Sequence, residues 1–230
     1  MKKTSFQLNK KLDKEIILDF LSAEEGGVDF GAGIISVHPQ LKKVKELSFK
    51  KRKEVVSKYV DTFYTKHNKE LRKTLSIFKK EWSVTENIYF TTVEKMFGKK
   101  PTPRKGYRAF LSIIDCNPRF LETKSFQIFW KHQDGVRFVT AHEILHFFFF
   151  DYVKKYFPKL YKSPFLWDVS EIFNSVILST QPFSSIHGVK KMIFYPHHRP
   201  MLKQALTTWK EKSDVGTYIP WLFEYVKSTQ

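Results

Sequence analysis

The chain has 230 residues, of which 42% are hydrophobic, and this suits one domain, or one domain with an extension, with ample material for a core. Its single cysteine, Cys116, excludes an internal disulfide and a zinc site built from cysteines. The formal net charge of +17 predicts attraction to polyanions such as nucleic acid, an acidic membrane face or acidic protein substrates. A basic surface without a dedicated partner explains this charge equally well.

The sequence shows neither a secretory signal nor an apolar run long enough to cross a bilayer. We therefore expect a soluble, cytoplasmic protein without a transmembrane segment.

The first part of the chain lacks a regular pattern. A short helix is expected over residues 12–21, and the glycines at positions 26, 27, 31 and 33 then interrupt the sequence. We interpret residues 1–43 as a loosely organised N-terminal extension and as a candidate pro-segment. Residues 44–230 are expected to form a single folded unit. Its first part, residues 44–98, reads as basic helices, because apolar residues recur there at helical spacing among many lysines.

The middle of the chain predicts two strands and a buried helix. Residues 107–114 and 125–132 read as strands, and residues 136–157 contain neither glycine nor proline while apolar side chains recur along them. Together, residues 105–157 form the second part of the unit. The third part, residues 165–230, begins with a helix over 165–178 and closes with helices over 201–212 and 218–227.

Residues 142–146 read His-Glu-Ile-Leu-His, and this motif is the most informative stretch of the sequence. Positions four apart on a helix lie one turn from each other on the same face, so His142 and His146 can bind one Zn²⁺ through their ring nitrogens. Glu143 can then act as the general base on a water at the metal. An accidental match with surface histidines is the alternative. The predicted burial of this helix favours a metal, because burying ionisable groups without partners is costly.

A catalytic zinc usually has three protein ligands, so a third one is needed. Asp168 and Glu171 lie three positions apart on the predicted helix 165–178 and therefore share one face. We choose Glu171 as the ligand, because its longer side chain reaches across a gap between helices. Asp168 or Asn174 would then orient a ligand histidine through its free N–H, although Asp168 could equally stabilise the helix N-terminus. Histidine is the other candidate ligand type, from positions 187, 197 or 198.

Residues 107–178 resemble the core of a zincin metallopeptidase of the gluzincin branch. The match consists of His142, Glu143, His146 and Glu171, and it covers less than half of the chain. The resemblance implies an α+β, mostly helical fold with a small mixed sheet, and one zinc per chain. This sequence departs from the family where Ser170 precedes the glutamate and where Ser175 replaces an acidic residue. The metzincin continuation of the motif is absent, and we assign no subfamily.

The resemblance also implies zinc-dependent hydrolysis of peptide bonds in a protein or peptide, most simply as an endopeptidase. Zinc and Glu143 would activate water, and Glu143 would pass the proton to the leaving amine. A Tyr or His donor would stabilise the oxyanion, and we choose Tyr195 and His198, with His187 and His197 as further candidates. The substrate would add to the sheet edge as an antiparallel strand, for which either predicted strand is a candidate.

Three alternatives stay open. The basic surface could bring such a protease to nucleic acid, as in DNA-associated zincins, which generally use a third histidine ligand. The chain could instead be a non-catalytic nucleic-acid-binding protein with a structural metal site. It could also be a latent protease in which residues 1–43 occupy the cleft.

Overall fold

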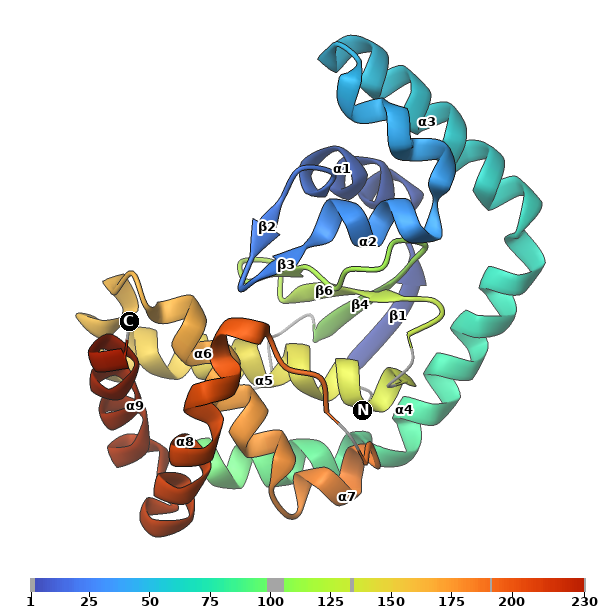
Figure 1. Ribbon diagram of the computed structural model, residues 1–230. Helices are drawn as coiled ribbons and strands as arrows, with labels where there is room; N and C mark the ends of the chain where they lie inside the picture. The colour runs from blue at the N-terminus through green and yellow to red at the C-terminus, as the bar shows by residue number, and fades with distance from the viewer. Residues whose placement is uncertain (1–2, 99–105, 133–134, 191, 230) are drawn as a thin grey trace. The chain divides into compact units, whose positions relative to one another are not determined.

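The computed structural model describes residues 3–98, 106–132, 135–190 and 192–229 (Figure 1). The chain folds into two compact units, of which unit 1 comprises Met1–Val84 and Lys105–Val136, and unit 2 comprises Thr85–Arg104 and Arg137–Gln230. The fold is α+β and mostly helical with a small mixed sheet, as the sequence predicted. No helix in the described part of the chain is long and apolar enough to cross a membrane.

Unit 1 contains a four-stranded sheet of order β1-β4-β6-β5. Its strands are β1 (Thr4–Leu8), β4 (Tyr107–Ser112), β5 (Arg119–Phe120) and β6 (Ser125–Phe129). The first three strands in the sheet order run parallel, and β5 pairs with β6 in the antiparallel sense. The two strands that the sequence predicted, over 107–114 and 125–132, are therefore confirmed as β4 and β6.

A separate hairpin and four helical segments complete unit 1. The hairpin joins β2 (Glu24–Glu25) to β3 (Val28–Asp29) through Gly26 and Gly27, whose φ angles of 60° and 80° are those of a tight hairpin turn. The helical segments are α1 (Lys10–Phe20), α2 (Phe30–Val37), the 3₁₀ helix η1 (Pro39–Glu46) and α3 (Phe49–Lys66). Figure 1 shows α1 and α2 on the same face of the sheet. The long helix α4 (Asn68–Phe97) begins in unit 1 and ends in unit 2.

The prediction of a loosely organised extension over residues 1–43 is wrong. β1 pairs with β4 along its whole length, from Thr4 opposite Tyr107 to Leu8 opposite Leu111. Gly31, which we took for a break in the pattern, lies inside α2, where a Cβ atom would meet the carbonyl oxygen of Leu21 at 2.0 Å. It therefore permits close packing. Because β1 pairs in the sheet, the first part of the chain is an integral part of unit 1.

The expectation that β4 or β6 forms the sheet edge is also wrong. β4 lies between β1 and β6, and β6 lies between β4 and β5. The residues just before β5 also bond to β6. The Gln127 N–H donates to the Pro118 carbonyl at 3.0 Å, and the Phe129 N–H donates to Asn117 Oδ1 at 3.0 Å. An added strand therefore could not pair with β6 without displacing this segment.

A buried carboxylate joins the sheet of unit 1 to its helices. Asp13 of α1 is fully buried and accepts hydrogen bonds from Tyr64 Oη of α3 at 2.6 Å and from Ser112 Oγ of β4 at 2.7 Å. Gln127 Nε2 of β6 donates to it at 2.8 Å, and the Ile113 N–H donates at 3.4 Å. Burial raises the pKa of Asp13 to about 6, although each of these donors acts to lower it.

Unit 2 is helical in its described residues. Its main helices are α5 (Gly135–Tyr156, which starts two residues before the unit boundary), α6 (Leu166–Ser179), α7 (Phe183–His187), α8 (Arg199–Lys212) and α9 (Val215–Thr229). Two 3₁₀ helices, η2 (Leu160–Lys162) and η3 (Pro196–His198), lie between them. The helices predicted over 136–157, 165–178, 201–212 and 218–227 are confirmed within a few residues at their ends.

We expect the Asp13→Ala substitution to lower the free energy of unfolding by about 3 kcal/mol or more, because it leaves several buried donors without their acceptor. Urea denaturation followed by circular dichroism measures this change. Asp19→Ala, on the exposed side of the same helix, is the matched control and should change stability by less than about 0.5 kcal/mol. Equal stability of the two variants would contradict the structural role of Asp13.

The stability difference between the wild-type chain and Asp13→Ala should also depend on pH. The pKa of Asp13 is raised from 3.8 to about 6, so between these values the folded chain binds this proton more readily than the unfolded chain. The contribution of Asp13 to stability therefore rises as the pH falls through 6. We expect the difference in free energy of unfolding between the wild-type chain and Asp13→Ala to be about 1 kcal/mol larger at pH 5 than at pH 8. An advantage that shrinks as the pH falls would show that the carboxyl pKa is not raised.

Candidate metal centre

Helix α5 carries the His-Glu-x-x-His motif, and ring side chains recur at every fourth position along this side of the helix. His142 and His146 lie one turn apart, and their Nε2 atoms are 3.0 Å from each other. Phe138, four positions earlier, and Phe150, four positions later, lie with their ring centroids 6.0 Å from those of His142 and His146. Two aromatic rings therefore flank the histidine pair along the helix, which limits the directions from which water can reach it.

Helix α6 brings Glu171 to the same two rings. Glu171 Oε2 lies 3.3 Å from His142 Nε2, and Glu171 Oε1 lies 3.3 Å from His146 Nε2. Apolar residues of α6, including Val169, Ile172 and Phe173, are fully buried, and they fix the helix in the core of unit 2. The structure therefore brings together the three residues that the sequence predicted as ligands.

This group fits a zinc ion in donor type and in spacing. Two imidazole nitrogens and a carboxylate oxygen are donors that zinc prefers. Ligand atoms bound at about 2.0–2.1 Å in tetrahedral geometry lie about 3.3 Å apart. Both distances from Glu171 to the histidines have this value, and the distance between the histidines is slightly shorter. Within the described residues, this is the one group of histidine, cysteine or acidic side chains close enough to share a metal ion.

The candidate centre is buried on most sides and has one more accessible ligand. The side chains of His146 and Glu171 are 0% and 2% exposed, whereas that of His142 is 20% exposed. A catalytic zinc site keeps one position for water or substrate, and the partial exposure of His142 is compatible with such a position. Glu143 is also buried, and its Oε1 lies 4.0 Å from His142 Nε2. Its carboxylate therefore lies beside the accessible ligand.

Two side chains from neighbouring helices hold the backbone of α5 where the motif begins. Asn174 Nδ2 of α6 donates to the His142 carbonyl at 2.8 Å, and Tyr89 Oη of α4 donates to the Ala141 carbonyl at 2.5 Å. Asn174, which we predicted to orient a ligand histidine through its ring, thus contacts that residue through its backbone. Tyr89 was not predicted, because nothing local in the sequence links it to the motif.

Asp168 lies one turn before Glu171 on α6 and contacts a different histidine. His198 Nε2 donates to Asp168 Oδ1 at 2.8 Å, and the His198 side chain is 1% exposed. Our prediction for Asp168 was a bond to a ligand histidine, whereas this bond joins α6 to the segment before α8. Asp168 also lies in the first turn of α6, where a negative charge stabilises the helix dipole.

The remaining predicted residues lie around this histidine–carboxylate pair. The Tyr195 ring centroid is 5.6 Å from that of His198, and the Trp167 ring, which sequence reasoning missed, lies 5.1 Å from Tyr195 and 5.2 Å from His198. Tyr195 is half-buried, so it is more accessible than His198.

The two other candidate histidines differ in exposure. His187 is buried, with Nε2 bonded to the Leu178 carbonyl at 2.9 Å and Nδ1 accepting from the Val189 N–H at 3.0 Å, so both ring nitrogens have backbone partners. His197 is exposed. The structure therefore includes neither of them in the candidate metal centre.

Comparisons with protein-family models, curated proteins and solved structures gave no match to this chain. The chemistry of the centre therefore follows from its own residues.

We expect the purified protein to hold about one zinc per chain, and His146→Ala and Glu171→Ala each to lose it, because two remaining ligands do not hold a catalytic zinc. Inductively coupled plasma mass spectrometry after dialysis measures the metal content, with circular dichroism as a check of folding. His197→Ala is the control and should keep its zinc. Loss of zinc in His197→Ala and its retention in Glu171→Ala would contradict the proposed ligand set.

Proposed function

We propose that the chain is a zinc metallopeptidase in which His142, His146 and Glu171 bind the metal and Glu143 is the general base. The observation that carries this proposal is the convergence of two imidazole nitrogens and both oxygens of one carboxylate within 3.3 Å, with a second buried carboxylate beside the accessible histidine. This combination has a direct use in hydrolysis, which needs a place for water and a base that can reach it.

Bound zinc would supply Lewis-acid chemistry, lowering the pKa of a water and polarising a peptide carbonyl. Glu143 follows the accessible ligand His142 in the sequence, and in this proposal it accepts the proton of the attacking water. It then donates this proton to the leaving amine, which needs it to depart as a neutral group. Burial of Glu143 supports this role, because a carboxyl removed from bulk water exchanges its proton with the substrate and not with solvent.

The residues at the start of α6 and before α8 have supporting roles in this proposal. A donor to the developing oxyanion must reach the substrate, and Tyr195 is more accessible than the buried His198. We therefore assign donation to Tyr195, and we assign to His198 and Asp168 the positioning of Tyr195 and Trp167 through their ring contacts.

A structural metal site in a non-catalytic protein has the same three ligands but does not use Glu143 or an accessible ligand. The 20% exposure of His142 and the adjacent carboxylate favour the catalytic function.

We expect Glu143→Gln to keep its zinc and to lose peptidase activity by about 100-fold or more, because the amide cannot accept the proton of water. Hydrolysis of a fluorescent casein, followed together with zinc content, measures both properties. Glu211→Gln, an exposed substitution of the same type on α8, should leave both unchanged. A zinc-loaded Glu143→Gln variant as active as the wild-type enzyme would overturn the assigned role.

A further inference from the structure

The junction of η1 and α3 in unit 1 carries an unusual concentration of positive charge. Between positions 42 and 53 the sequence has seven lysines and arginines and a single acidic residue, Glu46. This stretch lies in unit 1, whereas the residues of the candidate metal centre all belong to unit 2. The proposed peptidase chemistry makes no use of these charges, so they need a separate explanation.

Some of the cations in this region already have partners within the fold. Arg52 Nε donates to the Leu47 carbonyl at 2.8 Å, and its Nη2 donates to the Lys45 carbonyl, so Arg52 ties the end of η1 to α3. Lys10 and Lys14 of α1 pair with Asp61 of α3 at 2.7 and 2.8 Å. These bonds stabilise the packing of α1, η1 and α3, and they remove three cations from the set that a partner could use.

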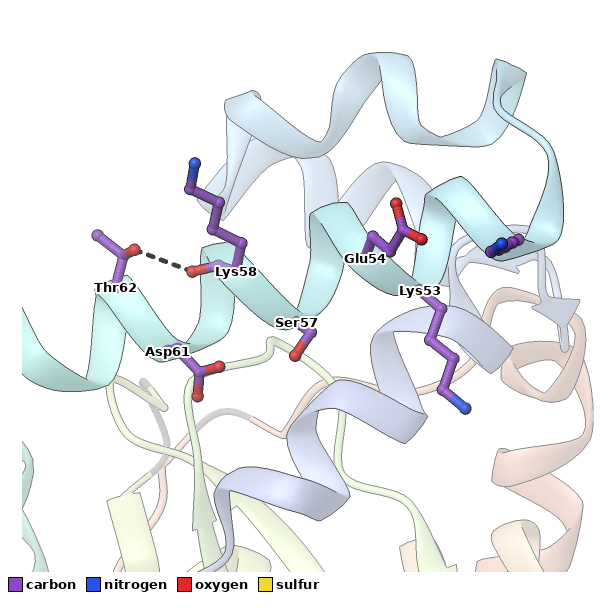
Figure 2. Close-up of a pocket in the computed structure, with 7 residues that line it drawn as sticks. Lys53, Glu54, Ser57, Lys58, Asp61 and Thr62 are labelled. Carbon is purple, nitrogen blue, oxygen red and sulfur yellow. Dashed lines mark hydrogen bonds between the residues drawn. The ribbon is translucent and has the colours of Figure 1, made fainter.

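Other lysines of α3 are not used in this way. Lys50, Lys53 and Lys58 line an open groove of about 670 Å³ along residues 50–62 of α3, together with two acidic residues, Glu54 and Asp61. Asp61 is paired with Lys10 and Lys14, and the three lysines of the groove form no ion pair with any residue that the structure describes. Figure 2 shows Lys53, Ser57, Lys58 and Asp61 along this helix. Helix α3 thus carries three lysines in this region that form no ion pair with the described residues. Such an arrangement attracts a partner that carries repeated negative charges.

Phe49, the first residue of α3, supplies a second kind of contact. Its side chain is 72% exposed, so the ring is accessible to a partner. It precedes Lys50 and Lys51 directly, so an aromatic ring and two ammonium groups project from the first turn of α3. Proteins that bind single-stranded nucleic acid combine these two elements, because bases stack on the ring while lysines track the phosphates.

The buried side of α3 argues against an anionic membrane as the partner. Val56, Val60 and Tyr64 are buried in unit 1, so the apolar face that a helix would insert into lipid is already used. What remains exposed is mainly charged, with Phe49 and the 41% exposed Val55 as its apolar members. This surface can attract phosphates but offers little area for insertion among acyl chains.

We propose that Phe49, Lys50, Lys51, Lys53 and Lys58, which lie in the first three turns of α3 and extend to more than one side of it, bind single-stranded nucleic acid. The lysines contact backbone phosphates, and Phe49 stacks on a base. Recognition of this kind has no strong sequence preference and weakens steeply with salt, because each neutralised phosphate releases counterions.

The test is fluorescence anisotropy with a fluorescein-labelled oligonucleotide of 20 thymidines, measured from 50 to 200 mM NaCl. The triple variant Lys50→Gln/Lys53→Gln/Lys58→Gln should bind about 10-fold or more weakly at 50 mM salt. Its plot of log affinity against log salt should lose about 2 from its slope, which corresponds to three phosphate contacts on a single strand. Phe49→Ala should weaken binding by about 5-fold or more and leave binding to a duplex of equal length unchanged.

The matched control is Lys203→Gln/Lys210→Gln/Lys212→Gln, which removes the same charge from exposed positions of α8. Equal weakening by the two triple variants would mean diffuse attraction to the net charge and would overturn the assignment. No binding by the wild-type chain at 50 mM salt would overturn it as well, as would binding only to phosphatidylserine vesicles. Glu143→Gln should bind the oligonucleotide like the wild-type chain, so this proposal and the proposed peptidase function fail separately.

Discussion

The polar row on helix α6 is the feature on which the candidate centre depends. Asp168, Glu171 and Asn174 are spaced by three residues and so follow one face of the helix. Each reaches a different partner: His198, the pair His142 and His146, and the His142 carbonyl, respectively. Most of the helix between Val169 and Leu178 is buried, and this packing fixes the position of the row opposite the motif on α5. A shift of α6 by one residue would remove all three contacts.

The same packing supports the proposal of a bound metal. Two imidazole nitrogens and a carboxylate lie within 3.3 Å of each other, and His146 and Glu171 are almost fully buried. In the proposal, a divalent cation at their centre would use all three donors at once. The apolar residues around the group would then limit the access of water to the metal.

The sequence predicted those residues of the site that are related by regular spacing within one helix. The histidine pair follows from a separation of four residues, and Glu171 was chosen on the face of a helix that the apolar pattern had already indicated. The row of Phe138 and Phe150 on either side of the histidines has the same four-residue spacing and could have been found. The Tyr89 contact could not, because it depends on how a helix more than 50 positions away packs onto α5. The burial of His187 and His198 could not be predicted, because a single sequence does not reveal which polar residues are buried.

In the N-terminal region, too, the fold depends on contacts between distant parts of the chain that a single sequence does not reveal. β1 has five residues and pairs with a strand about a hundred positions later, so its role is invisible until the pairing is known. The glycines that weakened the pattern permit a tight hairpin turn and a close helix contact. Helices such as α5 and α6 were easier to place, because their apolar periodicity is local. The short glycine-containing helix α2 was not predicted.

The central claim, a zinc bound by two histidines and a glutamate, can be tested most directly by X-ray absorption spectroscopy at the zinc edge of the purified protein. The account predicts nitrogen and oxygen ligands at about 2.0–2.1 Å, with outer-shell scattering from two imidazoles and no sulfur. Scattering from three imidazoles, or a sulfur ligand at about 2.3 Å, would contradict it.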